Sequence, residues 1–429
     1  MLSAGMKVLT MDKIMKKILF FVLSLMISVS SAEAKQFIVT VENNTKAPVD
    51  WEAFVTRSGG SVVEQYDFID GALLELSYEQ AERLKNNRSK GLTIEEDIPV
   101  QWLNEKKTSV RDLKDMYGAA APKIKVPAGR PVAAETSQPS RGPFDEVYEY
   151  YKPKGEYPWN IIRMDLNNVW KLTLGQGVKV AVVDTGINYN HPDLKPNYAG
   201  GMNCVKESNP PLDDNGHGTH VAGIIAAAFD NNGIIGIAPK ASLYSVKVMR
   251  KDGYGKPSEI LKGVEWCVKN NMHVVNMSIG VGDGFESINK AVQVAAANNI
   301  TVVCAAGNES EQVLNYPARI PETIAVTASD PNDKFAYFSN SGKETDFIAP
   351  GMFIYSTFKN GYQFHEGTSM ACPHITGMAV LAYSLGYRTP AQIRAALKAS
   401  AVKLGRIAAA KQGAGMPTGA GLAKYYLGK

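Results

Sequence analysis

The chain has 429 residues, of which 45% are hydrophobic and 21% are charged, and its formal net charge is +4. This composition is that of an ordinary globular protein, and the length exceeds one typical domain, so we expect two folded units. The positive charges are spread along the chain without a basic block, which gives no indication of nucleic-acid or anionic-membrane binding.

The N-terminal segment has the pattern of an export signal. Three lysines within residues 13–17 precede an apolar run over 18–29, and small residues of the kind a signal peptidase requires follow at 32–34. The run of about 12 residues is short for a membrane-spanning helix, which needs about 20. We predict a signal peptide over residues 1–34, with Met15 as the true start, and secretion to the extracellular space or the periplasm. An uncleaved anchor is the alternative.

The next segment has the pattern of a small α+β domain, predicted over residues 35–103. Alternating and apolar runs predict strands, and helical periodicity predicts two helices between them. The predicted order is a strand over 36–43, a helix over 49–58, two strands joined by a turn over 61–77, a helix over 77–87 and a strand over 91–98. This βαββαβ order is typical of a ferredoxin-like domain.

Residues 104–155 are predicted to be a Pro-rich linker. A short helix is possible near residues 107–120, but six prolines follow between 122 and 153 and few apolar residues recur periodically.

Residues 156–429 alternate short apolar runs with helical segments, which predicts an α/β fold. We expect a doubly wound, mainly parallel sheet with helices on both faces. The clearest strands are predicted over 178–184, 241–248, 273–279, 301–306 and 323–328. Sites in such sheets form outside the carboxyl ends of the strands, so polar residues at those ends should converge on one cleft.

Four short segments carry residue types that together perform one reaction. They contain Asp184 in VAVVDTG, His217 in NGHGTHVAG, Asn308 in VVCAAGNE and Ser369 in GTSMACPH. A serine hydroxyl needs a base within hydrogen-bond reach to become a nucleophile, and His217 supplies one. Asp184 can hold the imidazole in one tautomer, while the Asn308 amide and the Ser369 N–H can bind a carbonyl oxygen that becomes negative. Together the segments predict a serine protease that requires no metal for its chemistry.

Each motif alone has another interpretation. DTG also marks aspartic proteases, but those need two carboxylates that share a proton, and this chain has one DTG. His217 and His220 could bind zinc from one helix, yet no third ligand follows at a recognisable spacing, so we expect His220 to be structural. Cys372 lies three residues after Ser369. It is a poor candidate for the nucleophile because the hydroxyl of Ser369 already occupies the motif position. We expect buried free thiols at all four cysteines, Cys204, Cys267, Cys304 and Cys372.

The order Asp, His, Ser and the flanking residues resemble the subtilase (subtilisin) family. The resemblance covers nearly the whole chain after residue 36 and is close over residues 241–255, 264–280, 316–326 and 347–351. It implies a secreted, monomeric serine endopeptidase that acts on proteins or peptides and is made as a prepro-enzyme. The alternatives are a processing protease of narrow specificity and a catalytically silent subtilase that serves as a scaffold.

The same resemblance implies an inhibitor- and chaperone-type propeptide over residues 35–103 and a catalytic domain over 156–429. The propeptide would be the intramolecular inhibitor of its own enzyme; an ordinary ferredoxin-like binding module is the alternative. We predict a first self-cleavage at Leu103–Asn104 and a second trimming between Tyr148 and Tyr157. The linker over 104–155 departs from the family pattern.

The resemblance also implies where a substrate would bind. Two strand edges would pair with an extended peptide. The primary specificity pocket would lie between the second edge and the oxyanion segment, with Asn315 near its far wall. We expect broad cleavage after large apolar or aromatic residues. Val281 replaces the usual glycine after Gly280, and the segment after Glu309 is about four residues shorter than the family pattern. Both changes are of a kind that can narrow this preference. The implied contacts are Lys251, Gly253 and Gly255 on the first edge, Ser278, Ile279 and Gly280 on the second, and Ala305, Ala306, Gly307 and Asn315 in the pocket.

A structural calcium ion is the one cofactor that the resemblance implies. Calcium prefers six to eight oxygen ligands. The expected ligands are the side chains of Asp193 and Asp230 and the backbone carbonyls of Ala228, Asn232 and Ile234, with Glu156 completing the set. An ordinary Asx-rich turn is the alternative. A second, weaker cation site is expected near Asp346.

Overall fold

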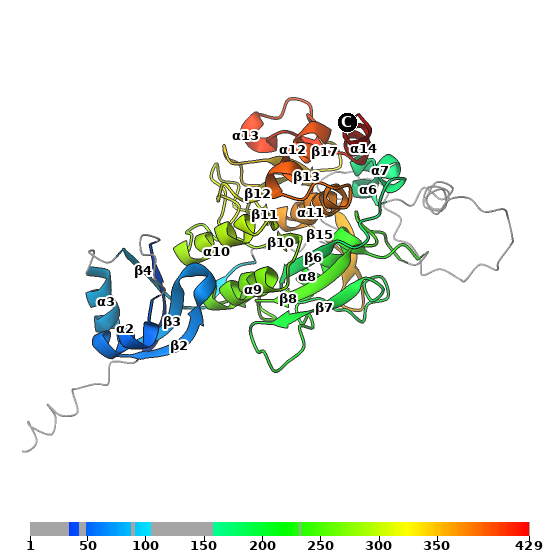
Figure 1. Ribbon diagram of the computed structural model, residues 1–429. Coiled ribbons are helices and arrows are strands. Elements are labelled where there is room, and N and C mark those ends of the chain that lie inside the picture. Colours follow the sequence, from blue (N-terminus) through cyan, green and yellow to red (C-terminus); the bar gives the residue numbers. More distant parts are fainter. Residues whose placement is uncertain (1–33, 43–48, 87–90, 104–157, 231–232, 429) are drawn as a thin grey trace, which may run out of the picture. The chain divides into compact units, whose positions relative to one another are not determined.

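The computed structural model describes residues 34–42, 49–86, 91–103, 158–230 and 233–428. The chain divides into two compact units, the first ending at Asp97 and the second beginning at Ile98 (Figure 1). The predicted signal peptide, apart from its last residue, and the predicted linker over 104–155 lie outside the described residues. Within the described part of the chain, no helix has the length and apolar character needed to cross a bilayer.

The first unit is a four-stranded antiparallel sheet with two helices, in the predicted βαββαβ order. The strands are ordered β2-β3-β1-β4. Helix α2 begins two residues later than predicted because Asp50 caps it, accepting a hydrogen bond from Ala53 N at 2.9 Å. Trp51 and Val55 of this helix are buried against the sheet. The bounds are β1 Lys35–Val41, α2 Trp51–Ser58, β2 Ser61–Tyr66, β3 Gly71–Leu76, α3 Tyr78–Asn86 and β4 Leu92–Glu96.

The second unit is built on a seven-stranded sheet in which all neighbouring strands are parallel. All five predicted strands are present, which confirms the predicted α/β class. Two edge strands, β7 and β13, were not predicted, because their sequences YAGGMN and FIAP contain glycines or a proline that disfavour strands. In spatial order the strands are β13 Phe347–Pro350, β12 Ile324–Ser329, β11 Thr301–Ala305, β10 Val274–Met277, β6 Lys179–Asp184, β8 Ser242–Lys247 and β7 Tyr198–Asn203.

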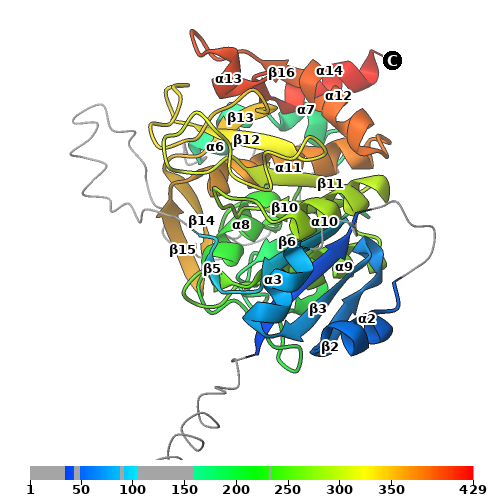
Figure 2. The same cartoon turned by 90° about the vertical axis from the view of Figure 1, so that its left-hand side faces the viewer.

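Helices cover both faces of this sheet. Helix α8, His217–Ala226, packs against α11, Thr368–Ser384, on one face, while α9, Pro257–Lys269, packs against α10, Glu286–Ala297, on the other (Figure 2). Glycines let each of the helices α8 and α11 pack closely on a neighbouring segment, Gly223 of α8 on Thr357 and Gly377 of α11 on Ile237. A Cβ at Gly223 would lie 2.3 Å from Thr357 Oγ1, and one at Gly377 would lie 2.5 Å from Ile237 Cβ. The two helices that begin near the candidate site are therefore held tightly in place.

Shorter elements complete the second unit. Strand β5 pairs antiparallel with β9, and β14 forms a hairpin with β15. These elements are β5 Val100–Gln101, α6 Trp159–Met164, α7 Asn167–Trp170, β9 Tyr254–Gly255, β14 Ile354–Phe358, β15 Gly361–His365, α12 Pro390–Ser400, β16 Ala401–Val402, α13 Ala409–Gln412, β17 Met416–Pro417 and α14 Gly419–Leu427.

Candidate active site

Asp184 and His217 form a buried hydrogen-bonded pair. Asp184 ends β6 and His217 begins α8, and His217 Nδ1 lies 2.7 Å from Asp184 Oδ1. Burial raises the pKa of the Asp184 carboxyl, whereas the hydrogen bonds from His217 and from Thr185 N favour its charged form. A carboxylate oxygen only accepts, so Nδ1 carries the imidazole proton and Nε2 keeps a lone pair. The pair therefore has the tautomer that a general base requires.

Ser369 lies in the first turn of α11, the helix that packs on α8. Its hydroxyl donates to Ser278 O at 3.1 Å, and Ser278 Oγ donates to Ser369 O at 2.9 Å. These reciprocal bonds join the predicted nucleophile to the second predicted substrate edge. The structure thus brings the helices that carry the base and the nucleophile together at the carboxyl ends of the central strands.

Asn308 is held in place by Thr368, the residue before Ser369. Its Oδ1 accepts from Thr368 N at 2.8 Å and from Thr368 Oγ1 at 2.9 Å, which fixes the orientation of the amide. A Cβ built on Gly367 would lie 3.6 Å from both Asn308 Nδ2 and Ser369 N. The two nitrogens therefore lie near one point beside Gly367, which is compatible with the predicted role of both as donors to a developing oxyanion.

Cys372 is not a competing nucleophile. Its Sγ lies 3.3 Å from Asn276 Oδ1 and 3.4 Å from Val303 O, either of which can accept its one S–H, and burial raises the pKa of the Cys372 thiol to about 12. A thiol that stays protonated near neutral pH is a poor nucleophile. All four cysteines are buried and outside disulfides, as predicted.

His220 is structural, as predicted. Its Nε2 lies 3.1 Å from Ile354 O and 3.0 Å from Gln363 O, so the ring joins α8 to the β14–β15 hairpin. Among the described residues, no group of three or more His, Cys, Asp or Glu side chains could hold a metal ion.

Both predicted substrate edges contact an extended segment, Val100–Leu103. Val100 and Gln101 pair antiparallel with Gly255 and Tyr254. Trp102 continues the pairing: its backbone N donates to Gly253 O at 3.2 Å, and its backbone O accepts from Gly280 N at 3.2 Å. A peptide in extended conformation therefore lies between the edges around Gly253–Gly255 and Gly280.

The Trp102 side chain anchors this segment. Its Nε1 donates to Gly255 O at 2.9 Å, its ring centroid lies 5.9 Å from that of Phe285, and only 2% of the residue is exposed.

Asn315 lies between the two walls of the predicted specificity pocket. A Cβ at Gly280 would be 3.0 Å from Asn315 Cβ, and one at Gly307 would be 2.7 Å from Asn315 Nδ2. The Asn315 side chain thus narrows the predicted specificity pocket. Ala305 and Ala306, which are also expected to line this pocket, are buried. Asn315 Nδ2 donates to Glu309 Oε2 at 3.2 Å.

Asn340, which sequence reasoning missed, braces this wall. The fully buried side chain donates from Nδ2 to Glu309 Oε2 at 2.7 Å and accepts at Oδ1 from Glu309 N at 3.1 Å and Glu311 N at 2.9 Å. Asn340 therefore supports the segment after Glu309 that is shorter than in the family pattern. No local motif identifies it, because its partners lie far away in the sequence. The functional role of Thr368, which orients the Asn308 amide, could in contrast have been predicted, because Thr368 stands beside Ser369 in the sequence.

The predicted calcium ligands gather around Asp193, whose carboxyl is buried. Its Oδ2 accepts from Ile234 N at 2.9 Å and its Oδ1 from Tyr362 OH at 3.0 Å, while its backbone O accepts from Ala228 N at 2.7 Å. Burial raises the pKa of Asp193 to about 6, and the charge of Asp230 adds to this rise. A divalent cation would offset the repulsion between the buried carboxyl of Asp193 and the exposed carboxyl of Asp230, and a set made only of oxygens suits calcium. Asn232 and Glu156 lie outside the described residues.

The second expected cation site, at Asp346, does not fit. Lys398 Nζ lies 3.4 Å from Asp346 Oδ1, and Arg394 Nη2 lies 3.6 Å from Oδ2. Two side-chain cations already neutralise this carboxylate, so we withdraw that expectation.

Comparison with known proteins agrees with this geometry. A family model described as the Subtilase family matches residues 175–416, more than half of the chain. The chain belongs to the subtilase family.

Individual relatives match the same part of the chain. Subtilisin E of Bacillus subtilis (strain 168) is 46% identical over 238 residues, which cover 54% of this chain and 62% of the relative. Subtilisin BL of Lederbergia lenta is 43% identical over 254 residues, covering 58% of this chain and 92% of the relative. A thermostable alkaline protease of Halalkalibacterium halodurans is 42% identical over 254 residues, covering 58% and 69%. The aligned region thus spans less than two thirds of Subtilisin E.

Proposed function

We propose that this subtilase is a serine endopeptidase with Ser369 as nucleophile and His217 as general base. The observation that carries the proposal is the buried 2.7 Å pair of His217 and Asp184, with His217 on the helix that packs against α11, whose first turn contains Ser369. A catalytically silent scaffold is the second candidate, but the whole set of catalytic residue types favours the enzyme.

The proposed reaction follows from the positions of these groups. Ser369 Oγ attacks the peptide carbonyl carbon while His217 Nε2 takes its proton, and Asp184 stabilises the imidazolium. Asn308 Nδ2 and Ser369 N hold the negative oxygen. His217 then gives the proton to the leaving amine. Water repeats the attack on the acyl-enzyme, with His217 again as base, and frees Ser369.

A simple assay tests the activity. The purified protein should hydrolyse casein, and a serine-directed reagent should stop hydrolysis and label Ser369. A thiol reagent serves as the control and should have little effect, because all four thiols are buried. Hydrolysis that resists the serine reagent but stops with the thiol reagent would redirect the assignment to a cysteine.

For the substrate, we propose extended segments of proteins or peptides with an apolar residue before the cut. The support is the pairing of Val100–Leu103 with both predicted edges, since strand pairing supplies affinity without demanding a particular sequence. A processing protease of narrow specificity is the alternative, and the position of Asn315 between Gly280 and Gly307 favours some narrowing. Cleavage profiling in a peptide mixture distinguishes the two.

We also propose that the enzyme is secreted as a prepro-form and processes itself. The N-terminal signal pattern supports secretion, and the βαββαβ unit before the catalytic part supports an inhibitory propeptide.

Calcium is proposed as a structural ion. Asp193, Asp230 and the carbonyls of Ala228 and Ile234 would hold it, with Asn232 as a further ligand, and it would neutralise the two carboxyls.

A further inference from the structure

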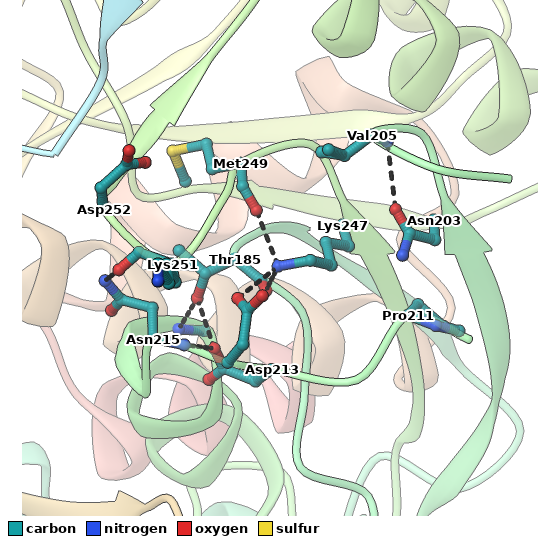
Figure 3. A network of polar contacts seen from close by, with 12 residues as sticks. Thr185, Asn203, Val205, Pro211, Asp213, Asn215, Lys247, Met249, Lys251 and Asp252 are labelled. Atoms are coloured by element: carbon teal, nitrogen blue, oxygen red, sulfur yellow. Dashed lines mark hydrogen bonds and ion pairs between the residues drawn. The ribbon is translucent and has the colours of Figure 1, made fainter. Parts of the chain in front are cut away.

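Lys247 is the only lysine classed as buried among the described residues. A buried ammonium group is costly unless all its hydrogens are bonded. Lys247 Nζ meets this condition with three acceptors: Thr185 O at 2.6 Å, Asp214 Oδ1 at 2.7 Å and Met249 O at 2.8 Å (Figure 3). An ammonium group has three hydrogens, so every donor has a partner.

The three acceptors belong to the three segments that the proposed reaction must align. Thr185 directly follows the catalytic acid Asp184, Asp214 lies in the loop that leads to His217, and Met249 precedes the substrate edge. Lys247 itself lies opposite Asp184 in the register of β6 and β8. One side chain therefore joins the acid, the loop of the base and the edge that binds substrate.

A second set of bonds joins the same segments through Asp213. Its Oδ1 accepts from Thr185 Oγ1 at 2.9 Å (Figure 3). The same Oδ1 accepts from Gly216 N at 2.9 Å, and Oδ2 accepts from Thr219 N at 2.9 Å. Thr185 is thus held at its carbonyl by Lys247 and at its hydroxyl by Asp213.

Asn215 extends this set of bonds to the substrate edge. Its Oδ1 accepts from His217 N at 3.0 Å, and its Nδ2 donates to Lys251 O at 2.8 Å. The loop before His217 is therefore joined twice to residues 249–251, through Asn215 to Lys251 and through Lys247 to Met249.

We infer that Lys247 is a positioning residue, which fixes the acid, the base loop and the substrate edge relative to one another. The inference rests on the proposed function, because it assigns Lys247 a role in that reaction. Its physical basis is that a displacement of about 1 Å at reacting groups can lower a rate about 100-fold. Lys247 acts through Thr185, Asp214 and Met249 and need not touch the substrate.

The role requires a compact cation rather than charge alone. Three acceptors converge on one Nζ atom, whereas a guanidinium spreads its donors over a plane and is larger. Arginine at this position would keep the charge and displace at least one of the three segments. A residue that only stabilised the fold through its charge would tolerate arginine better than methionine.

The test compares Lys247→Met and Lys247→Arg with two controls. Lys262→Met makes the same change at the partly exposed lysine that pairs with Glu207 at 3.0 Å. Trp170→Phe removes a buried donor from Ile237 O, outside the set of bonds described above. Each variant is expressed as the full chain and purified, and its N-terminus and melting temperature are measured. Rates are compared between proteins with the same N-terminus, and assays are run well below the lowest melting temperature.

Two readouts separate alignment of the triad from alignment of the edge. The rate at which a small serine-directed reagent modifies Ser369 reports the triad, and we expect it to fall about 10- to 100-fold in Lys247→Met. The KM for an extended peptide, divided by the KM for a short ester, reports the alignment of the substrate edge. This ratio should also rise in Lys247→Met. Lys247→Arg should show the same losses at least in part, and both controls should stay within about threefold of wild type.

The outcomes distinguish the inference from the proposed function. If the reagent does not label the wild-type protein at Ser369, the proposed function fails. If the wild type is labelled and either Lys247 variant reacts at the rate of the Trp170→Phe control, the positioning role is overturned. If Lys247→Met does not fold, Lys247→Arg still decides, because full activity in that variant contradicts the inferred geometry.

Discussion

Asn315 donates a hydrogen bond to Glu309 at 3.2 Å and thereby keeps its amide between Gly280 and Gly307. A polar side chain thus stands where the predicted pocket would receive the residue before the cut. One methylene more or less on a substrate side chain in an apolar pocket changes kcat/KM by about 10- to 200-fold. We therefore revise the expectation of broad cleavage after apolar or aromatic residues: the pocket should favour leucine and methionine over phenylalanine, tyrosine and tryptophan.

Asn315→Gly should therefore extend the pocket. The ratio of kcat/KM for peptides with phenylalanine before the cut to that for peptides with leucine should rise about 10-fold or more. Asn299→Gly is the matched control, because Asn299 is exposed after α10 and already has a φ of 60°. An unchanged ratio in Asn315→Gly would show that this side chain does not limit the pocket.

Substitutions in the triad should abolish turnover but leave the fold intact. Ser369→Ala, His217→Ala and Asp184→Asn should each remove most activity, with Ser208→Ala, an exposed serine, as control. Near-normal turnover in Ser369→Ala would refute the nucleophile assignment.

Removal of the Asn308 amide should have a smaller, measurable effect. Subtilisin is itself the type case for such a donor, and there the loss lowers kcat about 10²–10³-fold. Asn308→Ala or Asn308→Leu should lower kcat by a similar factor with little change in KM. Steady-state kinetics on a short peptide measure both parameters, and an unchanged kcat would remove Asn308 from the oxyanion site.

Calcium should raise thermal resistance if it binds the folded state at Asp193 and Asp230. Binding to the native state alone adds RT ln(1 + [L]/Kd) to its stability, so a chelator should lower the melting temperature and accelerate self-digestion. Asp230→Ala should mimic the chelator, whereas Asp283→Ala, at an exposed aspartate, should not. Equal melting and autolysis rates in calcium and in chelator would leave the loop as an ordinary turn.

His374 should make the fold sensitive to acid. Burial lowers the pKa of His374 to about 4, and its Nε2 lies 2.8 Å from Asn160 Nδ2, so a proton there would face an N–H group. The unfolded chain, with an ordinary histidine pKa of about 6.5, binds a proton at higher pH than the native state. The contribution of neutral His374 to the free energy of unfolding is therefore fully present above about pH 6.5. It is lost as the pH falls to about 4, and the loss amounts to about 3 kcal/mol.

Denaturant unfolding of inactive Ser369→Ala between pH 4 and 7 measures this loss without self-digestion. Adding His374→Gln should flatten the curve in that range, because the carboxylates that also titrate there are common to both proteins. Identical pH dependence in the two proteins would mean that His374 does not contribute.

The sequence predicted those features that depend on local patterns. Buried strands such as Lys179–Asp184 have continuous apolar runs, and Asp184, His217, Asn308 and Ser369 stand in short motifs. Asn340 escaped prediction because its bonds reach Glu309, 31 positions away. Each such bond arises only when the fold brings distant segments together.

Lys247 escaped prediction for a related reason. In the strand sequence SLYSVK a lysine is normally a solvated end, and its burial depends on acceptors from three separate segments. The edge strands β7 and β13 were missed because their pairing with β8 and β12 overrides a weak intrinsic preference for strand.

Maturation provides the last prediction, because Val100–Leu103 pairs with the proposed substrate edges. A tail that belongs to the same chain is present at high effective concentration, so the first cut should occur within one molecule at a rate independent of protein concentration. The candidate bond joins Leu103, which is largely buried beside Gly253, to Asn104, which lies outside the described residues.

Ser369→Ala decides whether this cut is self-processing. The variant should lose its signal peptide but keep residues 35–103 attached, because signal removal needs another enzyme whereas the cut after Leu103 needs Ser369. Mass spectrometry of wild type and variant measures both N-termini, and Ser208→Ala should mature like wild type. A variant that reaches the wild-type N-terminus without added protease would exclude self-processing, while a first wild-type cut far from Leu103 would exclude only the proposed bond. A cut that slows on dilution would instead indicate processing between molecules, because only an intramolecular step keeps its rate when the concentration falls.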